Sequence, residues 1–150
     1  MITDRRAHFR AGLHAAYIPY YDHLCQLLGE DWSPYCGLRS FEDQFRLYSQ
    51  GRTVKGPIVT KAKPGLSFHN YGLASDWDYF PSGVYTPLKS DDPRWQEYLD
   101  ACNEAALRCI DWEKPHNELS TVTQISAIFG AFKLGGMDAV TELLKREGKS

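Results

Sequence analysis

The sequence predicts a single α+β domain, and three observations support that fold class. The chain has 150 residues, which is enough for one domain with a core of its own. Helical periodicity dominates both ends, whereas the middle contains short apolar runs bounded by glycine and proline, as strands often are. Neither an internal repeat nor a linker divides the chain. We therefore expect one domain over residues 1–150, without a second binding domain.

Apolar residues recur at helical spacing over residues 4–29. Pro19 lies inside this stretch and predicts either a kink or two short helices, because proline removes a backbone donor. The following stretch WSPYCG, residues 32–37, is predicted to be a turn.

A helix is predicted within residues 39–52. Ser40 is the expected N-cap, Asp43 would complete a capping box, and Gly51 would end the helix. The residues expected on its buried face are Phe41, Phe45 and Tyr48.

The middle of the chain predicts loops around two strands. Residues 52–67 are rich in glycine and proline and contain a short strand candidate at 58–60. Residues 73–80 are predicted to form a longer strand, and residues 81–93 a loop.

A further helix is expected after Asp92 as N-cap, with Pro93 at its first position. Residues 111–119 predict a strand or bulge, because Pro115 forces the preceding residue into an extended conformation. The residues expected on the inner face of the helix are Trp95, Leu99, Cys102, Ala106 and Cys109.

Two helices are predicted to close the chain. The first would begin near Thr121, which forms a capping box with Gln124, and would end at Gly135 and Gly136. The second would cover residues 138–147.

Composition excludes several classes of protein. A net charge of −2 and an isoelectric point near 6.2 argue against a nucleic-acid partner. The first thirty residues lack the apolar core of a signal peptide, and no stretch has the ~20 apolar residues of a membrane span. We therefore expect a cytoplasmic protein that does not insert into a membrane. Its four cysteines form no CxxC pair and predict neither a zinc knuckle nor a disulfide.

His69 and Asp76 suggest a metal site. Asp76 is flanked by apolar residues, where an unpaired carboxylate is costly. Catalytic zinc sites use three protein ligands and leave one position for water. His116 is the candidate third ligand, and Glu113, three residues earlier, is a candidate base. The residues alone leave open a structural Asp76 that binds nearby backbone, and Glu-x-x-His is a weak signal by itself.

Two motifs resemble a known family. Ser67-x-His69-x-x-Gly72-x-Ala74-x-Asp76, followed by Trp112-Glu113-x-x-His116, resembles the zinc peptidases that cleave peptidoglycan stem peptides. The run GLRSFEDQFRLYSQGRTVKGPIVTKAKPGLSFHNYG looks like the L-alanyl-D-glutamate endopeptidase branch, which includes many phage endolysins. The resemblance covers residues 37–119 and implies a hedgehog/D-Ala-D-Ala peptidase-like fold, a small antiparallel sheet that carries the zinc site among helices.

The resemblance also implies roles for individual residues. Arg39 would lie near the scissile carbonyl, and Ser67 and Gln44 would line the substrate cleft. Glu113 would be the general base, at a position where members of this branch can have Asp, and Asn117 stands where a bulky residue is common. The residues that would bind Zn²⁺ are His69, Asp76 and His116.

The implied reaction is hydrolysis of the L-alanyl-D-glutamate bond of the peptidoglycan stem peptide during host lysis. The enzyme would act as a monomer and would depend on a holin for access to the wall. Two alternatives remain open at this point. One is a D-Ala-D-Ala carboxypeptidase or dipeptidase, and the other is a non-catalytic, zinc-stabilised binding domain of the same fold.

Overall fold

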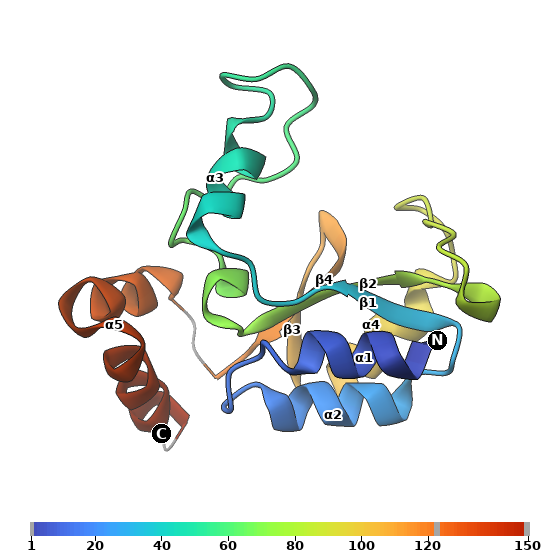
Figure 1. The fold of residues 1–150 in the computed structure, drawn as a ribbon. Coiled ribbons are helices and arrows are strands. Elements are labelled where there is room, and N and C mark those ends of the chain that lie inside the picture. Colours follow the sequence, from blue (N-terminus) through green and yellow to red (C-terminus); the bar gives the residue numbers. More distant parts are fainter. Residues whose placement is uncertain (1, 122–123, 149–150) are drawn as a thin grey trace.

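A four-stranded antiparallel sheet organises the computed structural model, which describes residues 2–121 and 124–148 (Figure 1). The strands lie in the order β1-β2-β4-β3. The α+β class with a small antiparallel sheet and surrounding helices is therefore confirmed. The strand bounds are β1 Trp32–Cys36, β2 Ala74–Tyr79, β3 Leu107–Ile110 and β4 Glu113–Leu119.

The helices cover the two faces of the sheet unequally. Helices α1, α2 and α4 cover one face, whereas α3 and the long loop after it project from the other (Figure 1). Helix α5 lies to one side of the sheet. The helical bounds are α1 Ile2–Arg10, α2 Ile18–Leu27, α3 Phe41–Ser49, η1 Phe68–Tyr71, η2 Pro81–Gly83, α4 Trp95–Glu104 and α5 Ile125–Gly148.

Successive side chains of β2 point alternately to the helix-covered core and to the opposite face of the sheet. Ser75 and Trp77 point toward the covering helices, where the Ser75 hydroxyl lies 2.7 Å from the Tyr17 hydroxyl. The Trp77 ring packs against Tyr21, with centroids 5.8 Å apart. Successive side chains of a strand point to opposite faces, so Asp76 lies on the face away from these helices.

Strand β4 repeats this alternation. Asn117 points into the core, where its amide donates to the Tyr98 hydroxyl at 2.9 Å. His116 and Glu118 therefore share the opposite face with Asp76. Asn117, which stands where the resembling family often has a bulky residue, consequently contributes to the core and not to the cavity on the other face.

The first third of the chain differs from the sequence prediction in two ways. Two helices form, but the break between them falls at residues 11–17, and Pro19 lies in the first turn of α2, where it costs no hydrogen bond. Residues 32–36 form β1 and not a turn. Pro34 is tolerated in this strand because β1 is at the edge of the sheet.

Helix α3 begins as predicted but buries a different face. The Ser40 hydroxyl accepts a hydrogen bond from the backbone N–H of Asp43 at 3.0 Å, which confirms the N-cap. The Asp43 carboxylate pairs with Arg46 and does not complete the capping box. Phe41 packs against the core as predicted, but Phe45 is 60% exposed and Gln44 is fully buried, so the predicted apolar stripe is wrong at Phe45.

Two further predictions, one on either side of the chain's midpoint, are wrong. Residues 58–60 are irregular and do not form a strand, and Ile58 and Val59 are exposed. Helix α4 ends at Glu104, and Ala106 then adopts a left-handed φ of 60°. Cys109 consequently lies on β3 and does not share a helix with Cys102. All four cysteines lie within the described residues, and none of them forms a disulfide there.

The predicted strands β2 and β4 are confirmed. Helix α5 is interrupted at Gly135 and Gly136, as expected, but it begins at Ile125 and not near Thr121. Residues 122–123 of the predicted first turn lie outside the described residues. In the ranges that the structure covers, no helix combines the length and apolar character needed to cross a membrane.

Candidate metal centre

Three side-chain atoms converge on the open face of the sheet. The His69 Nε2 atom lies 3.1 Å from Asp76 Oδ1 and 3.2 Å from His116 Nδ1. The third side of this triangle, from His116 Nδ1 to Asp76 Oδ1, is 3.2 Å. All three residues are at least 95% buried. The structure thus brings together the three residues predicted as metal ligands.

The backbone fixes two of these residues as a pair. Asp76 of β2 and His116 of β4 are directly opposite each other in the antiparallel ladder. Cross-strand partners on one face have neighbouring side chains, so this juxtaposition follows from the register alone.

His69 arrives from a separate turn. It lies in η1, which begins with Ser67 as a capping residue and ends at Gly72 in the left-handed region, with φ of 70°. A Cβ at Gly72 would lie 2.7 Å from the backbone nitrogen of His14, so only glycine fits between η1 and the α1–α2 connection.

Hydrogen bonds on the far side of each imidazole assign its tautomer. The His69 Nδ1 atom is 2.8 Å from the carbonyl oxygen of Gly37, to which it must donate. The His116 Nε2 atom is 2.6 Å from Glu118 Oε1 and donates to that carboxylate. When the rings are neutral, each therefore directs a lone pair, without a hydrogen, at the carboxylate of Asp76.

Such a cluster of acceptors needs a cation at its centre. Burial alone lowers the pKa of both imidazoles, but Asp76 reverses this effect and raises the pKa of His69 to about 10 and that of His116 to about 9. Burial raises the pKa of Asp76, and the two histidines outweigh it and hold that pKa well below its usual range. Each shift favours positive charge between these groups.

A metal ion fits this donor set. Tetrahedral coordination with bonds of ~2.0–2.1 Å places neighbouring ligand atoms about 3.3 Å apart, which matches the observed triangle. The second shell is also present, because Gly37 and Glu118 orient the two imidazoles. Two neutral nitrogens and one carboxylate form a typical catalytic set with one position left open.

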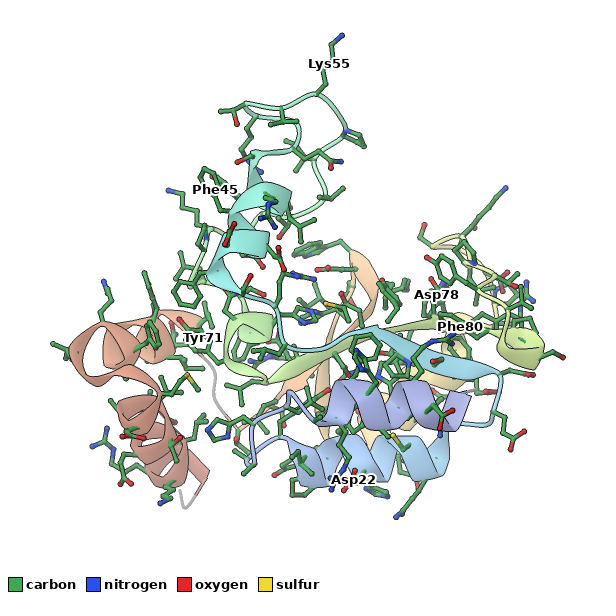
Figure 2. All side chains as sticks on the ribbon, in the orientation of Figure 1. Asp22, Phe45, Lys55, Tyr71, Asp78 and Phe80 are labelled. Carbon is green, nitrogen blue, oxygen red and sulfur yellow. The ribbon has the colours of Figure 1, made fainter. Side chains whose placement is uncertain are left out.

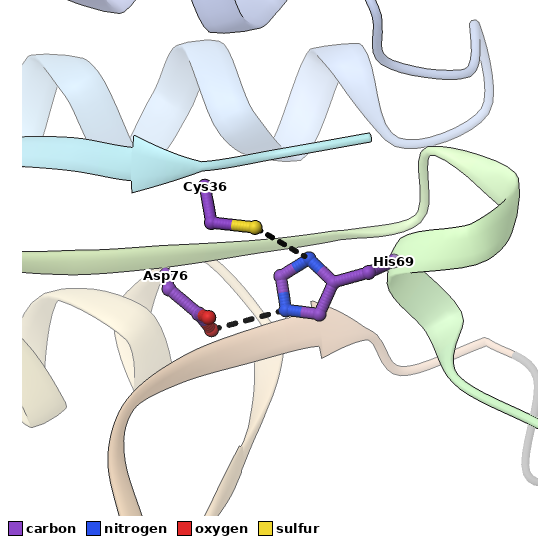
Figure 3. A group of neighbouring side chains, drawn as sticks. All are labelled: Cys36, His69 and Asp76. Carbon is purple, nitrogen blue, oxygen red and sulfur yellow. Dashed lines mark hydrogen bonds and ion pairs between the residues drawn. The ribbon is translucent and has the colours of Figure 1, made fainter. Parts of the chain in front are cut away.

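Cys36 lies beside His69 but on the wrong side of the ring for the same ion. Figure 3 shows its sulfur facing one ring nitrogen while Asp76 faces the other. The Cys36 Sγ atom is 3.8 Å from His69 Nδ1, the nitrogen already bonded to Gly37. Cys36 therefore borders the metal centre without completing the triangle.

Glu113 borders both the triangle and a cavity of about 470 Å³. A carboxylate oxygen of Glu113, one of Asp76 and a nitrogen of His116 lie within 4.8 Å of one another. Burial raises the pKa of Glu113, although the nearby histidines lower it in part. The cavity is lined by Arg39, Ser67, His69, Glu113, His116 and Glu118, among others.

Arg39 is fixed beside the ligand Asp76. Its Nη2 atom is 3.6 Å from Asp76 Oδ2 and donates to Cys36 Sγ at 3.2 Å. Its Nη1 atom donates to Gln44 Oε1 at 3.0 Å. The acidic residues in the first turn of the following helix α3, Glu42 and Asp43, pair instead with Arg46, so they leave Arg39 at the cavity.

The two residues predicted to line the cleft occupy different places. Ser67 lines the cavity, and its hydroxyl accepts from the backbone N–H of His69 at 3.3 Å. Gln44 is buried behind Arg39, and its amide donates to the carbonyl of Ala62 at 2.8 Å. Gln44 thus holds Arg39 and the cavity wall together, and a substrate contact for either residue stays a prediction.

Sequence reasoning missed the support for His116. Glu118 accepts from His116 and pairs with Arg108, whose Nη2 atom is 2.7 Å away. A signal for Glu118 was present, because a residue two positions from His116 on a strand shares its face. Arg108 and Cys36 gave no such signal, because each lies on a strand that the sequence did not reveal.

Comparisons with known proteins agree with this geometry. No family model matches the chain. The chain is 63% identical over 41 residues to the peptidoglycan L-alanyl-D-glutamate endopeptidase CwlK of Bacillus subtilis strain 168. That stretch covers 27% of this chain and only 25% of the length of CwlK.

The fold is similar to that of the Serratia marcescens L-Ala D-Glu endopeptidase ChiX. The TM-score is 0.51 at 18% sequence identity, and the match covers 79% of this chain and 88% of the ChiX chain. The resemblance to the L-alanyl-D-glutamate endopeptidase branch is therefore confirmed, in local sequence by the first relative and in fold by the second.

Proposed function

We propose that this chain is a zinc-dependent endopeptidase that hydrolyses the L-alanyl-D-glutamate bond of the peptidoglycan stem peptide. The triangle of His69, Asp76 and His116 beside a cavity with a free carboxylate carries the proposal. The similarity to CwlK supports the choice of bond. A binding domain would need neither Glu113 nor Arg39 at the cavity.

His69, Asp76 and His116 would hold the zinc ion through Nε2, Oδ1 and Nδ1. When bound, the ion supplies Lewis acidity, which polarises a carbonyl and makes water a better nucleophile near neutral pH. Glu118 and the Gly37 carbonyl keep both imidazoles in the tautomer that this requires.

Glu113 moves the proton. Its carboxylate takes a proton from the attacking water and delivers it to the amine nitrogen of the leaving D-glutamate. Its partly buried position raises its pKa, which brings the carboxyl closer to the working pH and favours both transfers.

Arg39 stabilises negative charge on the substrate. Its guanidinium is fixed by Gln44 and Cys36 before any substrate binds, so its remaining N–H groups are directed at the cavity. Donors that are fixed in advance stabilise the developing oxyanion without reorganisation.

The endolysins that this chain resembles suggest its biological setting. In this proposal the enzyme acts as a monomer, accumulates in the cytoplasm of an infected bacterium and reaches the wall through a holin. Co-expression with and without a holin tests this setting, because lysis should follow only when both proteins are present. Lysis by the chain alone would contradict holin dependence.

Digestion of purified peptidoglycan tests the reaction. Mass spectrometry with N-terminal labelling should find a new D-glutamate amine and a matching L-alanine carboxylate. Released D-alanine would instead identify a carboxypeptidase, and no product from the zinc-loaded protein would favour a binding domain.

A further inference from the structure

Two lysines bring unpaired positive charge to the cavity. Lys61 and Lys63 both line it, and neither forms a salt bridge with any residue in the described ranges. The acidic residue Glu118 is already shared between His116 and Arg108. Within the described ranges, the cavity wall therefore offers two cations that no salt bridge neutralises.

Lys61 is the better positioned of the two. Its Nζ atom lies 4.7 Å from the ring centroid of Trp112, in a cation–π contact. Trp112 belongs to the tight turn between β3 and β4, whereas Lys61 lies on the long loop between α3 and η1. The contact therefore joins two walls of the cavity.

Trp112 has no evident role in the core. It is 62% exposed although it lines the cavity, an unusual position for a large aromatic side chain. Its ring can hold the ammonium of Lys61 without neutralising it, since an indole carries no net charge. A ligand anion would still meet the full charge of Lys61.

The substrate chemistry supplies such an anion. Glutamate has two carboxyl groups, and at most one of them continues the peptide beyond the scissile bond. The residue on the amine side of that bond therefore keeps a free carboxylate near the reacting atoms.

We infer that Lys61, positioned by Trp112, binds this free carboxylate and makes the enzyme select for it. The inference rests on the proposed function and names the part of the substrate that the cavity recognises. Lys63 adds positive charge on the same wall without an aromatic partner among the described contacts, so its contribution is smaller.

A pair of stem peptides tests the inference. In one the free carboxylate of D-glutamate is intact, and in the other it is converted to a carboxamide. The zinc-loaded wild type should cleave the carboxylate peptide with a kcat/KM about 10–100-fold higher, the range of a hydrogen bond to a charged group. Lys61→Met should reduce this preference toward unity, mainly through KM.

Lys55→Met is the matched control, because Lys55 lies on the same loop but points away from the body of the molecule (Figure 2). This variant should keep the wild-type preference. Trp112→Leu should weaken the preference, and Trp112→Phe should retain most of it, because phenylalanine preserves an aromatic face.

The outcomes separate the inference from the proposed function. Equal cleavage of both peptides by the wild type, or an unchanged preference in Lys61→Met, would overturn the inference while the endopeptidase activity stood. Cleavage of neither peptide nor of purified peptidoglycan would defeat the proposed function, and the inference with it.

Discussion

The two faces of the sheet each bury a polar cluster, and the clusters differ in their supply of hydrogen-bond donors. On the helix-covered face, the Asn117 amide donates to Ser75 and Tyr98 and accepts from Tyr17. On the opposite face, one residue earlier in the chain, His116 meets His69 and Asp76, and with both rings neutral the atoms that face one another are all acceptors. Burial is nearly the same on both faces.

The difference shows that burial alone does not mark a functional site. Buried polar groups are normally paired, and the Asn117 cluster meets this requirement with its own hydroxyl and amide groups. The His116 cluster does not, because its remaining hydrogens point outward to Gly37 and Glu118. A cation must complete it, so in the proposed function two adjacent positions of one strand serve stability and chemistry separately.

The largest contrast should come from alanine at each of these adjacent positions. His116→Ala should lose the stoichiometric zinc and nearly all activity, because it removes a ligand. Asn117→Ala should keep the zinc but lose about 1–3 kcal/mol of unfolding free energy, because it leaves buried partners unpaired. Elemental analysis, peptidoglycan digestion and urea unfolding of both variants make the comparison. Zinc retained in His116→Ala would remove that residue from the metal site.

Replacement of the proposed base should affect activity without affecting the metal. Glu113→Gln keeps the size of the side chain but cannot accept the proton, so kcat should fall by about 10²–10⁴-fold. Zinc content should stay at one equivalent per chain. The control is Asp111→Asn, an exposed acid on the same β3–β4 turn, which should leave kcat unchanged. Loss of zinc from Glu113→Gln would make Glu113 a ligand.

Arg39→Lys should have a smaller effect. Lysine keeps the charge but lacks the planar fork whose separate nitrogens reach Gln44 and Cys36, so kcat/KM on a stem peptide should fall by about 10–10³-fold. Arg46→Lys is the control, because Arg46 is exposed on helix α3, away from the cavity, and pairs with Glu42 and Asp43. Equal activity of Arg39→Lys and wild type would exclude a role for the guanidinium fork.

The smallest effect concerns stability and pH. In the metal-free protein, His69 and His116 have pKa values raised from 6.5 to about 10 and about 9. Their protonation stabilises the fold fully below about pH 6.5, and this contribution is lost as the pH rises through 9 and 10. Zinc binding should show the opposite trend, because it requires deprotonated imidazoles.

Thermal unfolding between pH 6 and pH 10, with zinc and with a chelator, measures both trends. The melting temperature of the chelated protein should fall across this window, and the gap between the two forms should widen. Parallel curves for the two forms would mean that zinc does not bind at these imidazoles.

Local signals made much of the fold predictable. The Ser40 cap, the strand before Phe80 and the glycine break in α5 each depend on a few neighbouring residues, and all three were found. The two strands that were missed depend on context. Pro34 argues against a strand unless that strand is at an edge, and the turn at Ala106 uses a left-handed residue that is not glycine.

The candidate site, too, was predictable from the sequence only in part. Motif resemblance named His69, Asp76 and His116, and the structure brings them together. The sequence did not reveal that Gln44 is buried behind Arg39, because helical periodicity favoured the apolar Phe45 as the inward residue. A glutamine in the interior is stable only with partners, here Arg39 and the Ala62 carbonyl, that lie on other segments.

The spread of the ligands along the chain also has a topological consequence. His69 and Asp76 are 7 residues apart, and His116 lies 40 residues beyond Asp76. An ion held by all three is therefore a cross-link that closes a long loop through β2, α4, β3 and β4. Because all four cysteines are free, such an ion would take the place of a disulfide. Such an ion would restrict the unfolded chain by loop closure, so that the ion proposed for the reaction would also limit how far the chain can open to other proteases.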